Sequence, residues 1–124
     1  MAAKTVLLVD DEEIVIGVGR QMLEKLGFAV LTANNGKEAL DVYKNNQNEI
    51  DFIILDMIMP KMTGLKLADA IMKYRSDIPI MICTGFKPPE LDVDKSKTMI
   101  KKILMKPLML HDLASSIREV LDGK

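Results

Sequence analysis

Five polar side chains of this 124-residue sequence directly follow short apolar runs, where they could take part in chemistry at the ends of buried strands. They are Asp10, Asp11, Asp56, Thr84 and Lys106. Asp56 is the clearest case, because it ends the apolar run 52–55 and Pro60 follows shortly after it. A charge in that position is costly unless it is paired or bound to a metal ion. We therefore expect Asp56 to be a reactive group that the other residues activate.

The three aspartates predict a site for a divalent cation. Three carboxylates close together raise one another's pKa unless a cation lies among them. Asp10, Asp11 and Asp56 are too few ligands for a closed calcium site. Mg²⁺ prefers oxygen ligands in octahedral geometry and usually keeps waters or substrate phosphate in its shell. An open Mg²⁺ site that receives phosphoryl oxygens fits these residues better.

Lys106 and Thr84 match what phosphoryl transfer requires of a protein, which is mainly alignment and charge neutralisation. The ammonium of Lys106 can pair with one phosphoryl oxygen, and the hydroxyl of Thr84 can donate to another. Asp56 then remains as the carboxylate nucleophile of an aspartyl phosphate. The Lys106–Pro107 bond is a candidate for the cis form, which would point the ammonium inward.

The apolar runs that must position these residues predict five strands. They cover residues 5–9, 28–32, 51–56, 78–83 and 103–105. Each is apolar and of strand length, and the third is apolar almost throughout, as expected of a strand buried on both faces.

Helical patterns follow the strands. The acidic run 10–13 predicts the start of a first helix that ends at Gly27 and buries a stripe of Val15, Val18, Met22 and Leu26 alongside Gly19 and Leu23. Asn35 with Glu38 predicts a capped second helix, and Thr63-Gly64 begins a third that closes at Ser76-Asp77. Residues 86–98 predict a short, weak helix, and a strongly amphipathic one begins at Leu110.

Strands and helices therefore alternate five times, which predicts an α/β fold with a five-stranded parallel sheet and helices on both faces. In such sheets the working site lies at the carboxyl edge, near the switch in strand order. The five polar residues follow four different strands, so the topology alone brings them to this edge.

Composition limits the other functions open to the chain. Acidic and basic residues nearly balance, 18 against 17, which gives no overall field for direct nucleic acid or membrane binding. The lysines at 95, 97, 101 and 102 are interpreted as a solvated helix face. The single Cys83 lies in an apolar run, and no leader or membrane span is evident, so we expect one cytoplasmic domain over residues 1–124.

Each candidate residue also has a structural explanation. Asp10 and Asp11 could cap a helix, Asp56 could cap a turn, and Thr84 and Lys106 could satisfy or flank strand ends. Each explanation alone is at least as good as the functional one. Their joint occurrence at one sheet edge favours function. His111 has no partner at ligand spacing, so we interpret it as a surface or capping residue.

The order and spacing of these residues resemble the receiver domain of two-component response regulators. The matching segments are Val9-Asp10-Asp11-Glu12, Asp56-Met57-Ile58-Met59-Pro60 with Thr63-Gly64, Thr84-Gly85, and Lys106-Pro107. The resemblance covers nearly the whole chain and implies a flavodoxin-like (βα)5 fold.

The resemblance also implies a mechanism and partners. Asp56 would accept phosphate from a phosphohistidine on a sensor histidine kinase or phosphotransfer domain, with Thr84 and Lys106 contacting the phosphoryl group. Mg²⁺ would be bound by Asp10 or Asp11, by Asp56 and by the backbone carbonyl of Ile58. The chain would then be a stoichiometric phosphoacceptor and switch, not an enzyme, which assists its own phosphorylation and dephosphorylation. A phosphorylation-linked dimer stays open.

Two features set this chain apart within the family pattern. Ile103 stands where members often carry Tyr or Phe as a switch residue. Ile58 and Phe86 are bulky and apolar beside the phosphoacceptor, and we hypothesise that they shield an acyl phosphate from water.

Other functions fit less well. A small Mg²⁺-dependent phosphohydrolase with an aspartate nucleophile is the main alternative, but the dehalogenase type wants a second Asp where Ile58 stands. A flavodoxin-like cofactor carrier lacks its phosphate loop, and an unphosphorylated receiver would not need the full acidic set. No output module follows Gly123, so we expect a stand-alone regulator or a receiver from a longer protein such as a hybrid histidine kinase.

Overall fold

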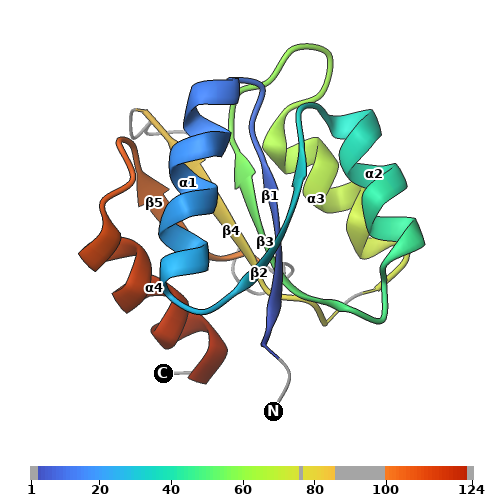
Figure 1. The fold of residues 1–124 in the computed structure, drawn as a ribbon. Coiled ribbons are helices and arrows are strands. Elements are labelled where there is room, and N and C mark those ends of the chain that lie inside the picture. The colour runs from blue at the N-terminus through green and yellow to red at the C-terminus, as the bar shows by residue number, and fades with distance from the viewer. Residues whose placement is uncertain (1–2, 76, 86–99, 123–124) are drawn as a thin grey trace.

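The computed structural model describes residues 3–75, 77–85 and 100–122 and contains a five-stranded parallel sheet (Figure 1). The strands are β1 (Thr5–Val9), β2 (Ala29–Ala33), β3 (Ile50–Asp56), β4 (Ile80–Thr84) and β5 (Ile100–Met105), in the order β2-β1-β3-β4-β5. The helices are α1 (Glu13–Lys25), α2 (Gly36–Asn45), α3 (Gly64–Met72) and α4 (Leu110–Asp122). The predicted α/β architecture is confirmed. The weak helix predicted over 86–98 lies outside the described residues.

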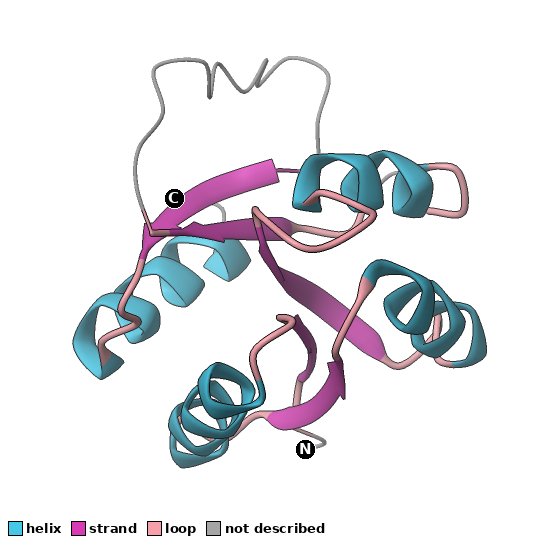
Figure 2. Cartoon of the chain, turned by 90° about the horizontal axis from the view of Figure 1, so that it is seen from above, coloured by secondary structure: helices cyan, strands magenta, loops and turns pink. Residues whose placement is uncertain are grey.

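Helices cover both faces of the sheet, as the view from above shows (Figure 2). Alternate residues of β3 separate the two cores: Ile53 and Leu55 pack with residues of α2 and α3, while Phe52 and Ile54 pack with residues of α1 and α4. All of β3 except Asp51 is buried. Burial on both faces explains why this strand is apolar almost throughout.

The edge strand β5 is longer than predicted, because Lys101 and Lys102 belong to it and not to a helix. An edge strand borders solvent, so charged side chains are tolerated there and hide the apolar pattern. Lys101 is exposed, and the Lys102 ammonium lies 2.8 Å from the Glu119 carboxylate on α4. The predicted bounds of β2 and β4 shift by one or two residues, and α3 ends at Met72, before the predicted stop.

The predicted buried stripe of α1 is partly wrong. Gly19 and Leu23 are the buried residues of this helix, whereas Val18 is 51% exposed. A Cβ atom on Gly19 would lie 2.9 Å from a methyl group of Leu8 on β1. The lack of a side chain at Gly19 therefore lets α1 approach the sheet on that side, and this turns Val18 outward.

The predicted helix ends are largely confirmed. The Asn35 side chain accepts a hydrogen bond from the Glu38 amide at 2.8 Å, and the Thr63 hydroxyl accepts one from the Lys66 amide at 3.2 Å. Gly27 follows α1 with φ +97°, a left-handed conformation that suits glycine. These caps set where α2 and α3 begin, and thus the length of the loops that lead into them.

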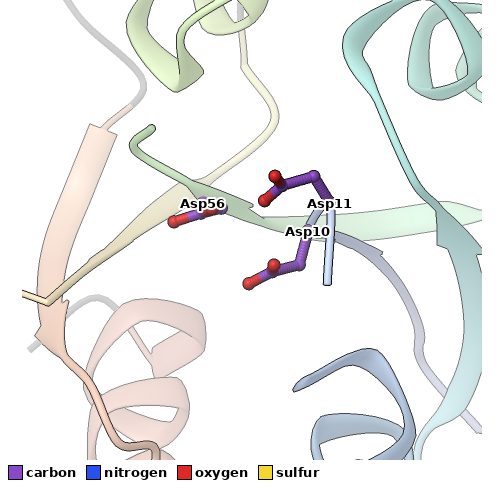
Figure 3. Close-up of side chains that lie close together, drawn as sticks. All are labelled: Asp10, Asp11 and Asp56. Carbon is purple, nitrogen blue, oxygen red and sulfur yellow. The ribbon is translucent and has the colours of Figure 1, made fainter. Parts of the chain in front are cut away.

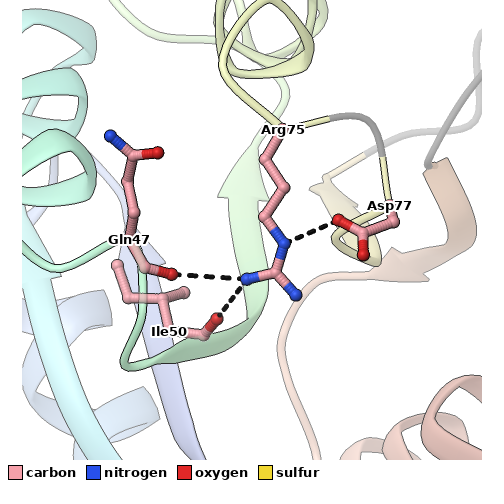
Figure 4. A network of polar contacts seen from close by, with 4 residues as sticks. All are labelled: Gln47, Ile50, Arg75 and Asp77. Carbon is pink, nitrogen blue, oxygen red and sulfur yellow. Dashed lines mark hydrogen bonds and ion pairs between the residues drawn. The ribbon is translucent and has the colours of Figure 1, made fainter.

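A polar network joins two loops at the end of the sheet opposite the aspartates (Figure 4). The Arg75 guanidinium donates to the Asp77 carboxylate at 2.6 Å and to the carbonyls of Gln47 and Ile50 at 3.3 and 3.2 Å. Arg75 thereby ties the segment after α3 to the turn that enters β3. The network satisfies backbone carbonyls, so we assign it a structural role.

Candidate functional site

The three aspartates meet at the carboxyl edge of the sheet (Figure 3). One carboxylate oxygen from each of Asp10, Asp11 and Asp56 lies within 4.8 Å of the others. The meeting follows from the topology, because β1 and β3 are parallel neighbours and Val9 pairs with Leu55, so both strands deliver their next residue to the same place. Asp10 and Asp56 are 2% and 6% exposed, and Asp11 is exposed.

Lys106 bridges the two buried carboxylates. Its ammonium nitrogen lies 2.8 Å from Asp10 Oδ2 and 3.1 Å from Asp56 Oδ1. The Lys106–Pro107 bond is cis, as the sequence suggested, and the Lys106 amide donates to the Thr84 carbonyl at 2.8 Å. The lysine that follows the edge strand therefore reaches back across the sheet to the ends of β1 and β3.

Electrostatics make Asp56 the unusual carboxylate of the site. Burial and the neighbouring charge of Asp10 raise the pKa of Asp56, and Lys106 only partly opposes this. Burial alone would lower the pKa of Lys106, but its hydrogen bonds to Asp10 and Asp56 outweigh that effect and the net pKa is raised. Lys106 is therefore protonated and lies beside a carboxylate whose ionised form is destabilised. A further cation next to Asp56 would stabilise that ionised form.

Asp10 also serves the helix that follows it. Its Oδ1 atom accepts a hydrogen bond from the Glu12 amide at 2.9 Å, while its other oxygen contacts Lys106. The capping position of α1 itself is taken by Glu12, whose side chain makes no capping hydrogen bond. Asp10 is therefore not the helix cap, and its two oxygens have different partners, the Glu12 amide and the Lys106 ammonium.

Thr84 ends β4 at the same edge and is 1% exposed. Its neighbour Cys83 pairs in register with Asp56, so Thr84 lies one residue further along β4 than the partner of Asp56. Cys83 is a buried free cysteine, and burial raises its pKa to about 12. The thiol therefore stays protonated at neutral pH.

The loop from 57 to 63 begins directly at Asp56. The Met57 amide donates to the Cys83 carbonyl at 2.8 Å, and the Met57 carbonyl accepts from the Gly64 amide at 2.9 Å. Ile58 follows and is 55% exposed. These hydrogen bonds occupy both polar groups of the Met57 backbone. The next carbonyl along the chain is that of Ile58, which the family resemblance implies as a metal ligand.

The donor set suits Mg²⁺. Three carboxylate oxygens from separate residues lie close together, two of the residues are nearly buried, and all the donors are hard oxygens. Asp10, Asp11 and Asp56 could hold the ion.

An apolar groove that sequence reasoning missed adjoins the site. It has a volume of about 400 Å³ and runs between α1 and the segment after β5. Its lining residues are Ile14, Val15, Val18, Gly19, Met22, Lys106, Pro107 and Leu108. Ile14 is 82% exposed. The signal in the sequence was that apolar residues of α1 span more of the helix circumference than one sheet contact can bury.

Comparisons with known proteins agree with this geometry. A family model described as the response regulator receiver domain matches residues 6–118. The sensor kinase CckA of Brucella abortus is 31% identical over 118 residues, which cover 95% of this chain but 12% of CckA. The response regulator receiver protein CpdR of the same organism is 33% identical over 119 residues, 95% of this chain and 97% of CpdR.

Among solved structures, the CheX–CheY–BeF3–Mg²⁺ complex from Borrelia burgdorferi matches with a TM-score of 0.88 and 28% identity, over 95% of this chain and 89% of the matched one. Within the described part of the chain, no helix is both long enough and apolar enough to cross a membrane.

Proposed function

This chain belongs to the response regulator receiver family, and we propose that Asp56 is the residue on which it accepts a phosphoryl group. Members of this family are phosphoryl-accepting switches of two-component systems. The observation that carries the assignment is the bridge from Lys106 to Asp10 and Asp56 beside the cluster of three carboxylates. Residues 1–124 would form one receiver domain.

The phosphoryl group would come from a phosphohistidine. An Asp56 oxygen attacks the phosphorus in line with the bond to the imidazole nitrogen, a P–O bond forms, and the P–N bond breaks with its electron pair leaving on nitrogen. Bound Mg²⁺ would neutralise charge on the phosphoryl oxygens. Asp10, Asp11, Asp56 and the Ile58 carbonyl would hold it.

Two further residues would stabilise the product. The Lys106 ammonium already lies 3.1 Å from Asp56 Oδ1, so a small shift lets it pair with a phosphoryl oxygen. The hydroxyl of Thr84 would donate to a second oxygen. Because each contact is made only when the phosphoryl group is present, phosphorylation would bias a two-state equilibrium of the domain.

The groove beside the site offers a place for the phosphodonor to bind. Lys106 and Pro107 form part of its wall, so a protein bound there lies next to Asp56. Ile14 and Val18 are exposed apolar side chains on α1, the kind of surface that a partner helix covers. We place the histidine-bearing helix of a sensor kinase or phosphotransfer domain in this groove.

The relatives leave two organisations open for the whole protein. The chain spans 12% of CckA and 97% of CpdR, so its matches include a long sensor kinase and a protein of similar length. The buried free Cys83 is compatible with a reducing compartment, and we propose that the domain works in the cytoplasm.

Intact mass after incubation with Mg²⁺ and acetyl phosphate tests the assignment. We expect one phosphoryl adduct on the unmodified protein, none on Asp56→Asn, and one on Asp51→Asn. Asp51 is a matched control, because it lies at the other end of β3 and accepts a hydrogen bond from the Thr5 amide, which an asparagine oxygen can also accept. An adduct that persists in Asp56→Asn would refute the assignment. Continuous turnover of varied phosphoesters would favour the phosphohydrolase.

A further inference from the structure

The loop of residues 57–63 contains a tight turn in an unfavourable conformation. Lys61 has φ +69°, and the Met62 amide donates to the Pro60 carbonyl at 2.8 Å across it. A hydrogen bond between residues two apart, with a central φ near +75°, is the γ-turn that is rare and strained. A non-glycine residue holds this conformation only when its surroundings enforce it.

One enforcing contact lies immediately after the turn. The Met62 side chain packs on Gly36, the first residue of α2, in the space that a side chain would otherwise occupy. A Cβ atom built on Gly36 would lie 2.5 Å from the Met62 sulfur and 3.0 Å from the Met62 Cβ atom. The sulfur could swing away, but the Met62 Cβ atom moves only with the loop backbone. This packing of Met62 on Gly36, the seat of Met62, therefore fixes the path of the loop backbone at residue 62.

The other end of the loop is also fixed by close approach. A Cβ atom on Gly64 would collide with the carbonyl oxygen of Asp56, so α3 begins directly against the acceptor strand. Met59 is buried in the core between the sheet and the helices α2 and α3. Ile58 lies between these anchors and is itself 55% exposed.

We propose that Met62 and Gly36 are a positioning pair for the Mg²⁺ site. Seated on α2, Met62 holds the strained turn in place, and the turn in turn fixes the direction of the Ile58 carbonyl relative to Asp10, Asp11 and Asp56. Neither residue touches the ion. The inference rests on the proposed function, because it assigns a role toward the metal that this function requires.

Titration calorimetry with Mg²⁺ on the unphosphorylated domain tests the pair. Gly36→Ala inserts a methyl group into the space that Met62 fills, and Met62→Ala removes the Met62 sulfur and Cγ atoms from it. We expect each to weaken Mg²⁺ binding by roughly tenfold, the range seen when residues that orient metal ligands are changed. Because both substitutions disrupt the same contact, the double variant should bind Mg²⁺ no more weakly than the single variant with the lower affinity. Met62→Leu, which retains apolar bulk, should weaken binding less and covers the case in which Met62→Ala does not fold.

Gly17→Ala is the matched control. It adds the same methyl group to a helix, but a Cβ atom on Gly17 would have no neighbour within 4 Å. Its Mg²⁺ affinity should equal that of the unmodified protein. Urea unfolding without Mg²⁺ checks that the variants are folded.

Phosphorylation by acetyl phosphate gives a second measurement. In Gly36→Ala and Met62→Ala its rate should fall at low Mg²⁺ and recover at saturating Mg²⁺, because these variants weaken binding of the ion and leave Asp56 in place.

The outcomes separate this inference from the function on which it rests. Unchanged Mg²⁺ affinity in folded Gly36→Ala and Met62→Ala would overturn the positioning role of the pair. A phosphoryl adduct on Asp56 in the same proteins would still support the proposed function. If the losses of Mg²⁺ affinity in the two single variants multiply in the double variant, the proposed pair is also overturned, because the two residues would then act independently. An unmodified protein that neither binds Mg²⁺ nor forms the adduct would overturn both.

Discussion

Replacing Lys106 by methionine should destabilise the metal-free domain far more than the same replacement at Lys102. Both ammonium groups lie 2.8 Å from a carboxylate oxygen, but the Lys106 side chain is 19% exposed and faces a carboxylate that is 3% exposed, whereas the Lys102 pair is 36% and 49% exposed. The two variants therefore compare one ion-pair distance in two environments.

The magnitude follows from the two contacts of Lys106. At an effective dielectric constant of about 20, charges separated by 2.8 and 3.1 Å attract by about 6 and about 5 kcal/mol. Desolvation of the buried ammonium offsets several kcal/mol of this sum. We expect a net loss of about 3–5 kcal/mol for Lys106→Met, the range measured when one partner of a buried pair is removed. Lys102→Met should lose at most about 1 kcal/mol.

Urea unfolding at pH 7 in the presence of a chelator measures both losses. Addition of Mg²⁺ should recover more stability in Lys106→Met than in the unmodified protein, because the ion then neutralises Asp10 and Asp56 without competition from the ammonium. Equal losses for the two variants, within about 0.5 kcal/mol, would refute the assignment of Lys106 as the cation that neutralises the site. A lack of extra recovery by Mg²⁺ would refute the idea that ion and lysine serve the same carboxylates.

Three further predictions concern single residues. Because the pKa of Asp56 is raised in the folded state, its ionisation weakens the fold at neutral pH and this effect disappears as the pH falls through the folded pKa. Asp56→Asn should thus gain stability over the unmodified protein at pH 7 and lose this advantage toward pH 4 in metal-free urea unfolding; a pH-independent difference would contradict it. Gly17→Ala should stabilise α1 by about 0.5–1 kcal/mol, since the added methyl group meets no neighbour within 4 Å; a loss of stability would show a hidden contact. Ile58→Asn should shorten the life of the phosphoryl adduct a few-fold in a mass time course, because its exposed apolar side chain would no longer exclude water; an unchanged decay would reject the shielding role.

The convergence of the site could be predicted from sequence because it depends on topology alone. Parallel strands deliver the residues that follow them to one edge, and the ends of β1 and β3 were recognisable from apolar runs that stop at aspartates. The bridge from Lys106 to two carboxylates could not be predicted, because it depends on the path of the chain after β5 and on side-chain reach.

The orientation of α1 shows where periodicity is insufficient. Ile14, Val15, Val18 and Met22 cover a wide arc, and a repeat of 3.6 residues does not say which part of it faces the sheet. Gly19 decides the orientation, because the Leu8 side chain occupies the space beside it. The same limit hid the groove, whose walls are the part of this arc that the sheet leaves uncovered.

The β5 boundary was missed for a different reason. A strand at an edge has one side toward solvent, so Lys101 and Lys102 interrupt the apolar pattern without ending the strand. The seat of Met62 on Gly36 was equally invisible, since a glycine at a helix start is ordinary until the neighbour that fills its place is known.

The strand order separates the place of the chemistry from the place where the shape can change. β3, which carries Asp56, is paired on both sides and buried on both faces, so it is among the least deformable parts of the molecule. β5 is paired on one side only, and Lys106 follows it. We therefore expect a structural change that begins at Asp56 to be accommodated at the β5 edge of the sheet and not within β3. We expect substitutions at this edge of the sheet to alter which surface responds, and how strongly, while Asp56 and the proposed metal ligands stay constant.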